Sequence, residues 1–221
     1  MKLKLTIALA LLASIQLPLL AQQKANLALR AGLNFQTIRG TDAMGDNMHN
    51  KFKDGYHAGI DVQIPLGVDI FLQPGLLYSM KGGRMETGGH EVSLSYIEMP
   101  VMIVHNPKVG NGLKYGRILM GIGAYIAKGL EGTYQYASGE KHDIPFGNRG
   151  NDANTLVNYN TSCKKFDFGV NGLMGYEFSR GIFLQLNGQL GLAKINVNTP
   201  DPNDHTSWRN GGLGVSMGYR F

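Results

Sequence analysis

His57 and Asp61 are the two residues of this chain that best fit general acid–base chemistry. A histidine titrates near neutral pH, and a nearby carboxylate can orient it or share its proton. In an extended segment, residues four positions apart lie on one face but about 13 Å apart. The two side chains therefore need partners on neighbouring strands, and we expect them to belong to a hydrogen-bonded polar interior instead of a catalytic site.

Other reactive residue types give weaker signals. Asp201, Asp204 and His205 are spaced closely enough for a metal site, but solvated loop residues are the favoured interpretation. Cys163 lies beside two lysines, a setting that can activate a thiol, but an ordinary loop residue is the favoured interpretation. No serine lies in a nucleophile-elbow motif. We therefore expect no enzyme activity, no catalytic residues, no cofactor and no bound metal.

Eight segments must position these side chains, and all of them alternate apolar residues with small or polar ones. This period of two is typical of a β-strand with two different faces. Near the end of the chain, Leu213, Val215, Met217, Tyr219 and Phe221 alternate with glycine, serine and arginine. Each segment is near the length of about 9–11 residues that a tilted membrane-spanning strand needs. The predicted strands are 26–35, 55–64, 68–81, 92–105, 113–128, 166–178, 182–195 and 211–221.

The second face of these segments combines glycines with charged residues. Such a face is odd for an exterior, but it suits the interior, or lumen, of an eight-stranded barrel, which is barely wide enough for side chains. Closing the barrel pairs every backbone group, as lipid requires. We expect the lumen charges to form ion pairs, because unpaired buried charges are costly, and so to fill the lumen. The predicted lumen cluster is Arg30, His57, Asp61, Glu98, Arg117, Asp167, Glu177 and Arg220, with Lys81 facing the same way.

Aromatic residues on the apolar face occur at the strand ends, whereas aliphatic residues occupy the strand centres. Two aromatic girdles around an aliphatic band are typical of barrels that cross a membrane. The predicted girdles are Phe35, Tyr56, Tyr78, Phe166 and Phe168 at one end, and Tyr176, Phe178, Tyr219 and Phe221 at the other.

The connections between the strands alternate in length, which predicts short periplasmic turns and long extracellular loops. The long connections are 36–54, 82–91, 129–165 and 196–210, and the short ones are 65–67, 106–112 and 179–181. Loop 129–165 holds Tyr134, Tyr136, Phe146 and Tyr159, a candidate binding surface; a purely hydrophilic loop is the equal alternative. Pro74 and Pro100 have no backbone N–H, so each removes a hydrogen-bond donor from the pairing between strands. This predicts a bulge or a water-filled gap at each proline.

The N-terminal segment, residues 1–22, has the pattern of a cleaved signal peptide. Lys2 and Lys4 precede an apolar run that is shorter than the ~20 residues of a transmembrane helix. Cleavage after Ala21 or Gln22 would leave one domain, residues 23–221. Removing Lys2 and Lys4 with this segment lowers the net charge from +5 to +3, which is mild. No basic run interleaves with aromatics, so we expect no nucleic-acid partner. A single cysteine excludes an internal disulfide.

Six strand motifs carry a family resemblance: Ala31-Gly-Leu-Asn-Phe35, Gly55-Tyr-His-Ala-Gly59, Leu72-Gln-Pro-Gly-Leu-Leu-Tyr-Ser79, Tyr96-Ile-Glu-Met-Pro100, Phe166-Asp-Phe-Gly169 and Gly218-Tyr-Arg-Phe221. In their order and spacing, the chain resembles the PorT-like outer-membrane β-barrel proteins of the Bacteroidetes. Gly75 departs from this family, which often has Glu there. The resemblance implies an OmpA/OmpX-like barrel whose terminal Phe221 is read by the β-barrel assembly machinery. The founding member is linked to protein secretion and surface-protein maturation, but the resemblance implies little chemistry.

The predicted function is therefore a non-enzymatic outer-membrane barrel, a scaffold whose extracellular loops serve binding, envelope or secretion roles. Outer-membrane lipids and the assembly machinery are the expected partners. A small channel, a membrane-embedded enzyme and a soluble, lipocalin-like ligand binder remain alternatives. Inward-facing Phe71, Tyr96, Leu119 and Phe183 argue against an open channel.

Overall fold

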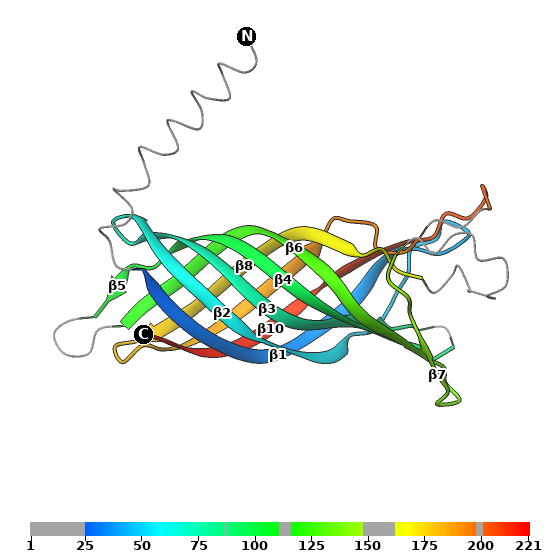
Figure 1. Cartoon of the computed structure of the whole chain (residues 1–221), viewed down its shortest axis with the longest axis horizontal. Helices are drawn as coiled ribbons and strands as arrows, with labels where there is room; N and C mark the ends of the chain where they lie inside the picture. The colour runs from blue at the N-terminus through cyan, green and yellow to red at the C-terminus, as the bar shows by residue number, and fades with distance from the viewer. Residues whose placement is uncertain (1–24, 87, 111–115, 148–161, 198–200) are drawn as a thin grey trace, which may run out of the picture.

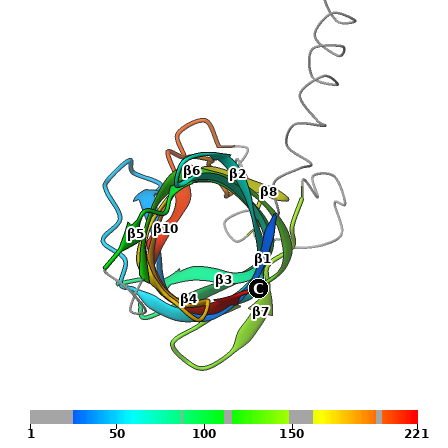
Figure 2. The same cartoon turned by 90° about the vertical axis from the view of Figure 1, so that its left-hand side faces the viewer.

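The computed structural model, which describes residues 25–86, 88–110, 116–147, 162–197 and 201–221, is a closed antiparallel β-barrel (Figures 1 and 2). Each long strand pairs with the next along the chain, and β1 pairs with β10 to close the ring. Two short strands, β5 (Lys108–Val109) and β7 (Lys141–Asp143), pair with β6. The eight long strands are β1 (Asn26–Thr41), β2 (Lys53–Gly67), β3 (Ile70–Arg84), β4 (Glu91–His105), β6 (Gly116–Gln135), β8 (Phe166–Phe178), β9 (Ile182–Gly191) and β10 (Ser207–Arg220).

The alternation of the sequence places apolar side chains outside and polar ones inside. Leu33, Ile122 and Leu213 are 60%, 75% and 60% exposed on the outer wall, whereas Asp61 and Glu98 are buried. A soluble barrel of the lipocalin type would show the reverse, so that alternative is wrong. In the described part of the chain, no helix is long and apolar enough to cross a membrane.

Several strands continue beyond the predicted ends on the side of the long loops. The strand predicted as 26–35 runs to Thr41, the one predicted as 113–128 runs to Gln135, and β10 already begins at Ser207. Strand β9 instead ends at Gly191, before the predicted residue 195. The extensions and β7 form the tapering end opposite the C-terminus in Figure 1. The barrel wall is therefore longer, and the extracellular loops shorter, than the polar composition of residues 36–54 and 129–165 suggested.

A β-bulge in β6 re-aims the side chains of this extension. Ser95 pairs with Glu131 but Tyr96 pairs with Gly129, so Leu130 is an extra residue on β6. One extra residue exchanges the inner and outer faces beyond that point. As a result Tyr134 faces inward and is buried, although it would face outward on an uninterrupted strand.

The two prolines interrupt the backbone pairing beside them without producing a bulge, one of the two outcomes predicted for each. The β3–β4 register is the same on either side of Pro74, from Gln73–Met102 to Leu77–Glu98. Pro100 itself pairs in register with Tyr125 of β6. The ladder between β2 and β3 passes from Asp61–Gly75 to Ile64–Leu72, so pairing lapses beside Pro74 without a change of register. The register shifts lie instead at Ser95/Tyr96 and at Pro65/Gly67.

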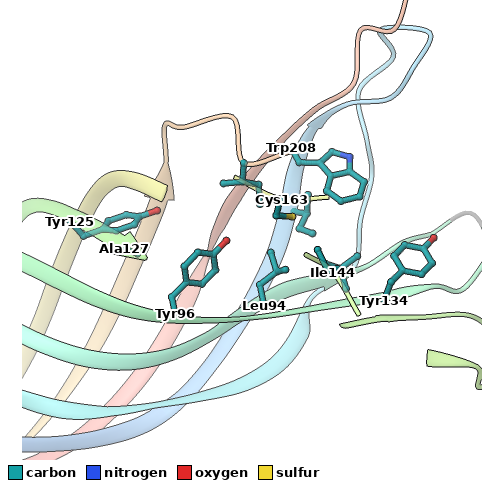
Figure 3. Close-up of a cluster of buried hydrophobic side chains, with 11 residues drawn as sticks. Leu94, Tyr96, Tyr125, Ala127, Tyr134, Ile144, Cys163 and Trp208 are labelled. Carbon is teal, nitrogen blue, oxygen red and sulfur yellow. The ribbon is translucent and has the colours of Figure 1, made fainter. Parts of the chain in front are cut away.

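Apolar side chains fill the extracellular end of the lumen, where the strands extend (Figure 3). Their neighbours on the outer wall at this height are polar and exposed, for example Arg39, Arg84 and Glu131. The polarity of the wall thus inverts along the barrel axis. We call this cluster the plug: Ile38, Val92, Leu94, Tyr96, Tyr125, Ala127, Tyr134, Ile144, Cys163, Ile195 and Trp208.

A second, smaller apolar cluster lies near the opposite end of the lumen. It contains Ala28, Met102, Val104, Leu119 and Phe183, with Leu173 packed against it. Polar side chains of the lumen, including Asp61 and Glu98, form a polar layer between the two clusters. Glu177 and Arg220 instead lie beside the second cluster, as the cross-strand partners of Phe183 and Ala28.

Candidate functional site

The centre of the polar layer is an ion cluster around Lys81. The Nζ atom of Lys81 lies 2.8 Å from Glu98 Oε2 and 3.4 Å from Asp167 Oδ2. It also lies 4.0 Å from the ring centroid of Tyr125, a cation–π distance. The Tyr125 hydroxyl and Asn210 Nδ2 both donate to Asp167 Oδ2, at 3.0 and 2.9 Å. This ammonium group is thus enclosed by two carboxylates and an aromatic face.

Two further ion pairs lie toward the periplasmic end. Arg30 Nε is 2.7 Å from Asp61 Oδ2, and Arg220 Nε donates to Glu177 Oε2 at 2.8 Å. Apart from His57, whose partners are uncharged, the members of the predicted lumen cluster therefore lie as ion pairs. Arg117 is the exception in burial: its side chain is 29% exposed, and its Nη1 donates to the Asn106 carbonyl at 3.1 Å.

His57 takes partners that the sequence did not indicate. Its Nδ1 lies 2.8 Å from Asn34 Oδ1 and its Nε2 lies 2.7 Å from Ser216 Oγ, whereas Asp61 pairs with Arg30. Gly32 makes this possible, because it is the cross-strand partner of both His57 and Ser216. A Cβ atom at Gly32 would lie 2.7 Å from His57 Cε1. The glycine lets the imidazole reach across β1 to β10.

The Ser216–His57–Asn34 chain has the connectivity of a nucleophile, a base and an orienting group. Ser216 is completely buried, however, and its Oγ also accepts a hydrogen bond from Asn187 Nδ2 at 2.7 Å. The adjacent lumen cavity has a volume of about 50 Å³. At roughly 10–15 Å³ of such volume per water, it holds a few water molecules but no substrate. The geometry is that of a hydrogen-bonded interior.

The plug closes the lumen at the extracellular end (Figure 3). Tyr96 is completely buried, and its ring packs edge-on against Phe146 with centroids 5.7 Å apart. Loop residues complete the plug from above: the amide of Ile144 donates to the Gly132 carbonyl and that of Ile195 to the Trp208 carbonyl, both at 2.8 Å. An ion entering from this side would meet apolar side chains before reaching the polar layer.

The candidate binding surface in the loop that follows β6 requires a correction. Tyr134 lies in β6 and points into the plug, and Tyr136 and Phe146 pack against the plug while partly buried. Tyr159 lies outside the described residues. The three described rings stabilise the extracellular end of the barrel and do not form an exposed aromatic patch. The bulge at Leu130 and the return of the chain over the barrel mouth are the physical reasons.

The predicted girdle residues lie on the outer wall. Eight are exposed and Tyr78 is half-buried. Tyr56 and Tyr78 stack with ring centroids 5.8 Å apart, and the pairs Tyr176–Phe178 and Tyr219–Phe221 each have centroids 5.0 Å apart. The nine residues are Phe35, Tyr56, Tyr78, Phe166, Phe168, Tyr176, Phe178, Tyr219 and Phe221.

The remaining reactive residues have structural partners. Asp201 Oδ1 accepts from the Asn203 amide at 2.9 Å, and Asp204 Oδ1 accepts from the Thr206 amide at 2.8 Å. Within the described ranges, no group of three or more potential ligands could hold a metal ion. Cys163 is fully buried in the plug, and burial raises the pKa of its thiol to about 12. The lysines beside it in sequence do not activate it.

A closed eight-stranded barrel with an apolar outer wall and a charged, filled lumen defines the class of outer-membrane β-barrels. The chain belongs to the outer membrane protein beta-barrel domain family, whose model matches residues 20–196. No curated protein sequence matches the chain.

Solved structures with similar folds include two bacterial proteins. The attachment invasion locus protein Ail of Yersinia pestis is 9% identical with a TM-score of 0.42, and Neisserial surface protein A is 10% identical with a TM-score of 0.46. Each comparison covers 90% of this chain and 100% of the other. At this level of similarity, the assignment of the fold depends on the strand pairing and the family match.

Proposed function

We propose that this protein is a non-conducting outer-membrane scaffold whose function lies at its extracellular end. The observation that carries the proposal is the filled lumen. The Lys81 ion cluster occupies its centre, and the plug, which includes Tyr96 and Trp208, closes it above. A channel needs a continuous polar path, and two successive obstructions of different chemistry leave none.

The extracellular end has features that suit a binding scaffold. Its loops are tied to one another: Thr41 Oγ1 donates to the His205 carbonyl at 2.6 Å, and the Lys164 amide donates to the Ile195 carbonyl at 2.6 Å. The β6–β7 hairpin projects beyond the barrel wall (Figure 1). Loops held on a rigid wall present side chains with little ordering cost, which favours recognition of another molecule.

Two finer roles belong to the same proposal. The basic and apolar pattern of residues 1–22 supports export through a cleaved signal peptide, and the terminal Phe221 supports delivery by the barrel assembly machinery. The PorT-like resemblance adds secretion or surface-protein maturation as the process that the scaffold would serve. The cavity beside His57, about 50 Å³ in volume, is too small for a substrate, which supports a structural role for the Ser216–His57–Asn34 chain.

Single-channel recording tests the filled lumen. The purified full chain is inserted into planar bilayers, with an outer-membrane porin inserted under the same conditions as the control. We expect no unitary current steps from this protein at membrane potentials at which the porin gives clear steps. Regular steps of one size would contradict the proposal and favour the small-channel alternative.

Cysteine labelling on intact cells tests the location and the orientation. Ser138 lies in the exposed β6–β7 hairpin and Ser179 in the exposed turn between β8 and β9, at the opposite end. We expect Ser138→Cys, and not Ser179→Cys, to react with a membrane-impermeant maleimide. The native thiol at Cys163 is buried and adds little background. Labelling of Ser179→Cys alone would reverse the orientation and overturn the proposal.

A further inference from the structure

Two arginines of like charge face each other on the outer wall. Arg39 of β1 and Arg209 of β10 are direct cross-strand partners, and both are exposed. The residues that flank Arg209, Trp208 and Asn210, are buried in the lumen, so Arg209 points outward. Directly opposite residues in an antiparallel pair have Cα atoms about 4.5–5.5 Å apart. Like charges at this separation destabilise a sheet, so the pair needs a compensating partner.

The described residues do not supply that partner. Neither arginine has an ion pair there, whereas the nearby cations Arg84 and Lys53 both pair with Glu91. The neighbouring outward carboxylate on β2, Asp54, lies opposite Phe35, four positions from Arg39 along β1. That separation is about 13 Å. Asp204, a carboxylate just before β10, accepts hydrogen bonds at Oδ1 from the amide and hydroxyl of Thr206.

The barrel wall is shaped to hold one of the two guanidinium groups. Gly211 faces outward but is buried, because Arg39 covers it. A Cβ atom at Gly211 would lie 2.7 Å from Arg39 Nε and 3.3 Å from its Cζ. The glycine thus leaves a notch on the outer wall that the Arg39 guanidinium occupies. Two positions further along β10 is Leu213, which pairs with Phe35 of the aromatic girdle nearer the long loops.

We propose that Arg39 and Arg209 bind the phosphate of an outer-leaflet lipid headgroup. Arginine offers a planar fork of donors that matches a phosphate, and one anion between two guanidiniums removes their repulsion. The height fits, because headgroups begin at the level of the aromatic girdle. A lipid is favoured over a free ion since the apolar wall below, at Leu213 and Phe35, is positioned to contact its acyl chains. The inference depends on the orientation in the proposed function.

The experiment uses the full chain in phosphatidylcholine bicelles, with nitrogen-15 NMR signals of the arginine Nε–Hε groups as the readout. Titration with lipid A, a bisphosphorylated glycolipid, should shift the Arg39 and Arg209 signals in a saturable way. The double variant Arg39→Gln/Arg209→Gln lacks these two signals, so its affinity is read from the phosphorus-31 signals of lipid A. It should bind about tenfold more weakly or worse, the loss expected for charge-assisted hydrogen bonds. Arg84→Gln is the matched control, because Arg84 already pairs with Glu91; its affinity should stay within about twofold of the wild type.

Two further titrations define the ligand. Dephosphorylated lipid A should give no saturable shift, and an equal shift would overturn the proposal. Inorganic phosphate should bind much more weakly; equal binding would identify a free-anion site and overturn the lipid assignment. Unchanged affinity of the double variant would also overturn it. Thermal unfolding gives a second readout: Arg39→Gln should match or raise the midpoint in dodecyl maltoside, where repulsion is uncompensated, and lower it when lipid A is present.

The labelling of Ser138→Cys separates this inference from the proposed function. If the orientation is as proposed and lipid A does not bind, only the lipid site is wrong. If the hairpin faces the periplasm, the two arginines are on the wrong side of the membrane and both proposals fail.

Discussion

Replacing Lys81 by Met should be among the most damaging single substitutions in this barrel. Methionine nearly preserves the volume but removes the charge between Glu98 and Asp167. All three side chains are at most 4% exposed, so solvent cannot take over the role of the ammonium group. Breaking a buried ion pair by removing one partner costs about 3–5 kcal/mol of unfolding free energy.

The contacts of each carboxylate refine this figure. Glu98 keeps two hydrogen bonds from Gln189 Nε2, at 2.9 and 3.0 Å, and Asp167 keeps those from Tyr125 and Asn210. These donors reduce the free-energy cost of removing the Lys81 charge. The lost cation–π contact with Tyr125 adds about 1–2 kcal/mol when desolvated. We therefore expect a total loss of about 4 kcal/mol.

Urea unfolding in phospholipid vesicles measures this loss, and Trp208 provides the signal. It is the sole tryptophan of the chain and is buried in the plug. The control Lys141→Met removes an exposed lysine of β7 and should change stability by less than about 0.5 kcal/mol.

The triple variant Lys81→Met/Glu98→Gln/Asp167→Asn decides whether the loss comes from uncompensated charge. It removes all three charges together, so it should recover much of the stability that Lys81→Met loses. A loss below about 1 kcal/mol for Lys81→Met would refute the reasoning. A triple variant no more stable than the single one would refute it as well.

Three further predictions concern the closed barrel, the plug and the glycines. Unboiled protein should migrate differently from boiled protein on a gel, because a closed ladder resists detergent; identical migration would contradict closure. The thiol of Cys163, with its pKa raised to about 12, should resist maleimide at pH 8 in the folded protein and react in urea; fast labelling of folded protein would exclude the buried position. Since this pKa exceeds the ordinary value of 9, the thiol should start to lower stability only above pH 9. Gly32→Ala should lower the free energy of unfolding by about 2 kcal/mol, because its Cβ would meet the Val215 carbonyl and His57. Gly188→Ala should be neutral or stabilising by up to about 1 kcal/mol, since its Cβ would meet only Leu213, at 3.9 Å. Equal effects of the two substitutions on unfolding would contradict the packing.

The period of two was sufficient to predict the barrel and its two faces. One face of each strand meets lipid and the other a narrow lumen, so the pattern is strict at membrane height. Leu33 and Leu213 lie outside and Asp61 and Glu98 inside, as the alternation predicted. The ion pairs were predicted as a class from the cost of burying single charges, but the identity of the partners was not.

The partners depend on the strand register, which alternation alone does not give. His57 of β2 reaches Ser216 of β10 because Gly32, on the intervening strand β1, has no side chain between them. Gly32 is one of many glycines in the sequence, and nothing local distinguishes it from the others. The plug was also missed, since Cys163 is an isolated apolar residue in a polar loop and Ile195 was placed at the end of a predicted strand, whereas β9 ends at Gly191. Their burial requires the loops to fold back over the barrel mouth.

The inversion of polarity along the wall follows from where water lies. At membrane height the exterior is lipid, so Ile60 and Val215 lie outside while Asp61 and Ser216 lie inside. Beyond the girdle the exterior is water, and a wall that kept its apolar face outward would expose that surface to it. The extended strands satisfy both solvents by reversing the pattern, with the Leu130 bulge supplying the change of face on β6. A rigid, water-facing extension is what a surface scaffold needs, and its apolar filling also closes the pore. The closed lumen and the projecting extracellular end are therefore two results of the same packing.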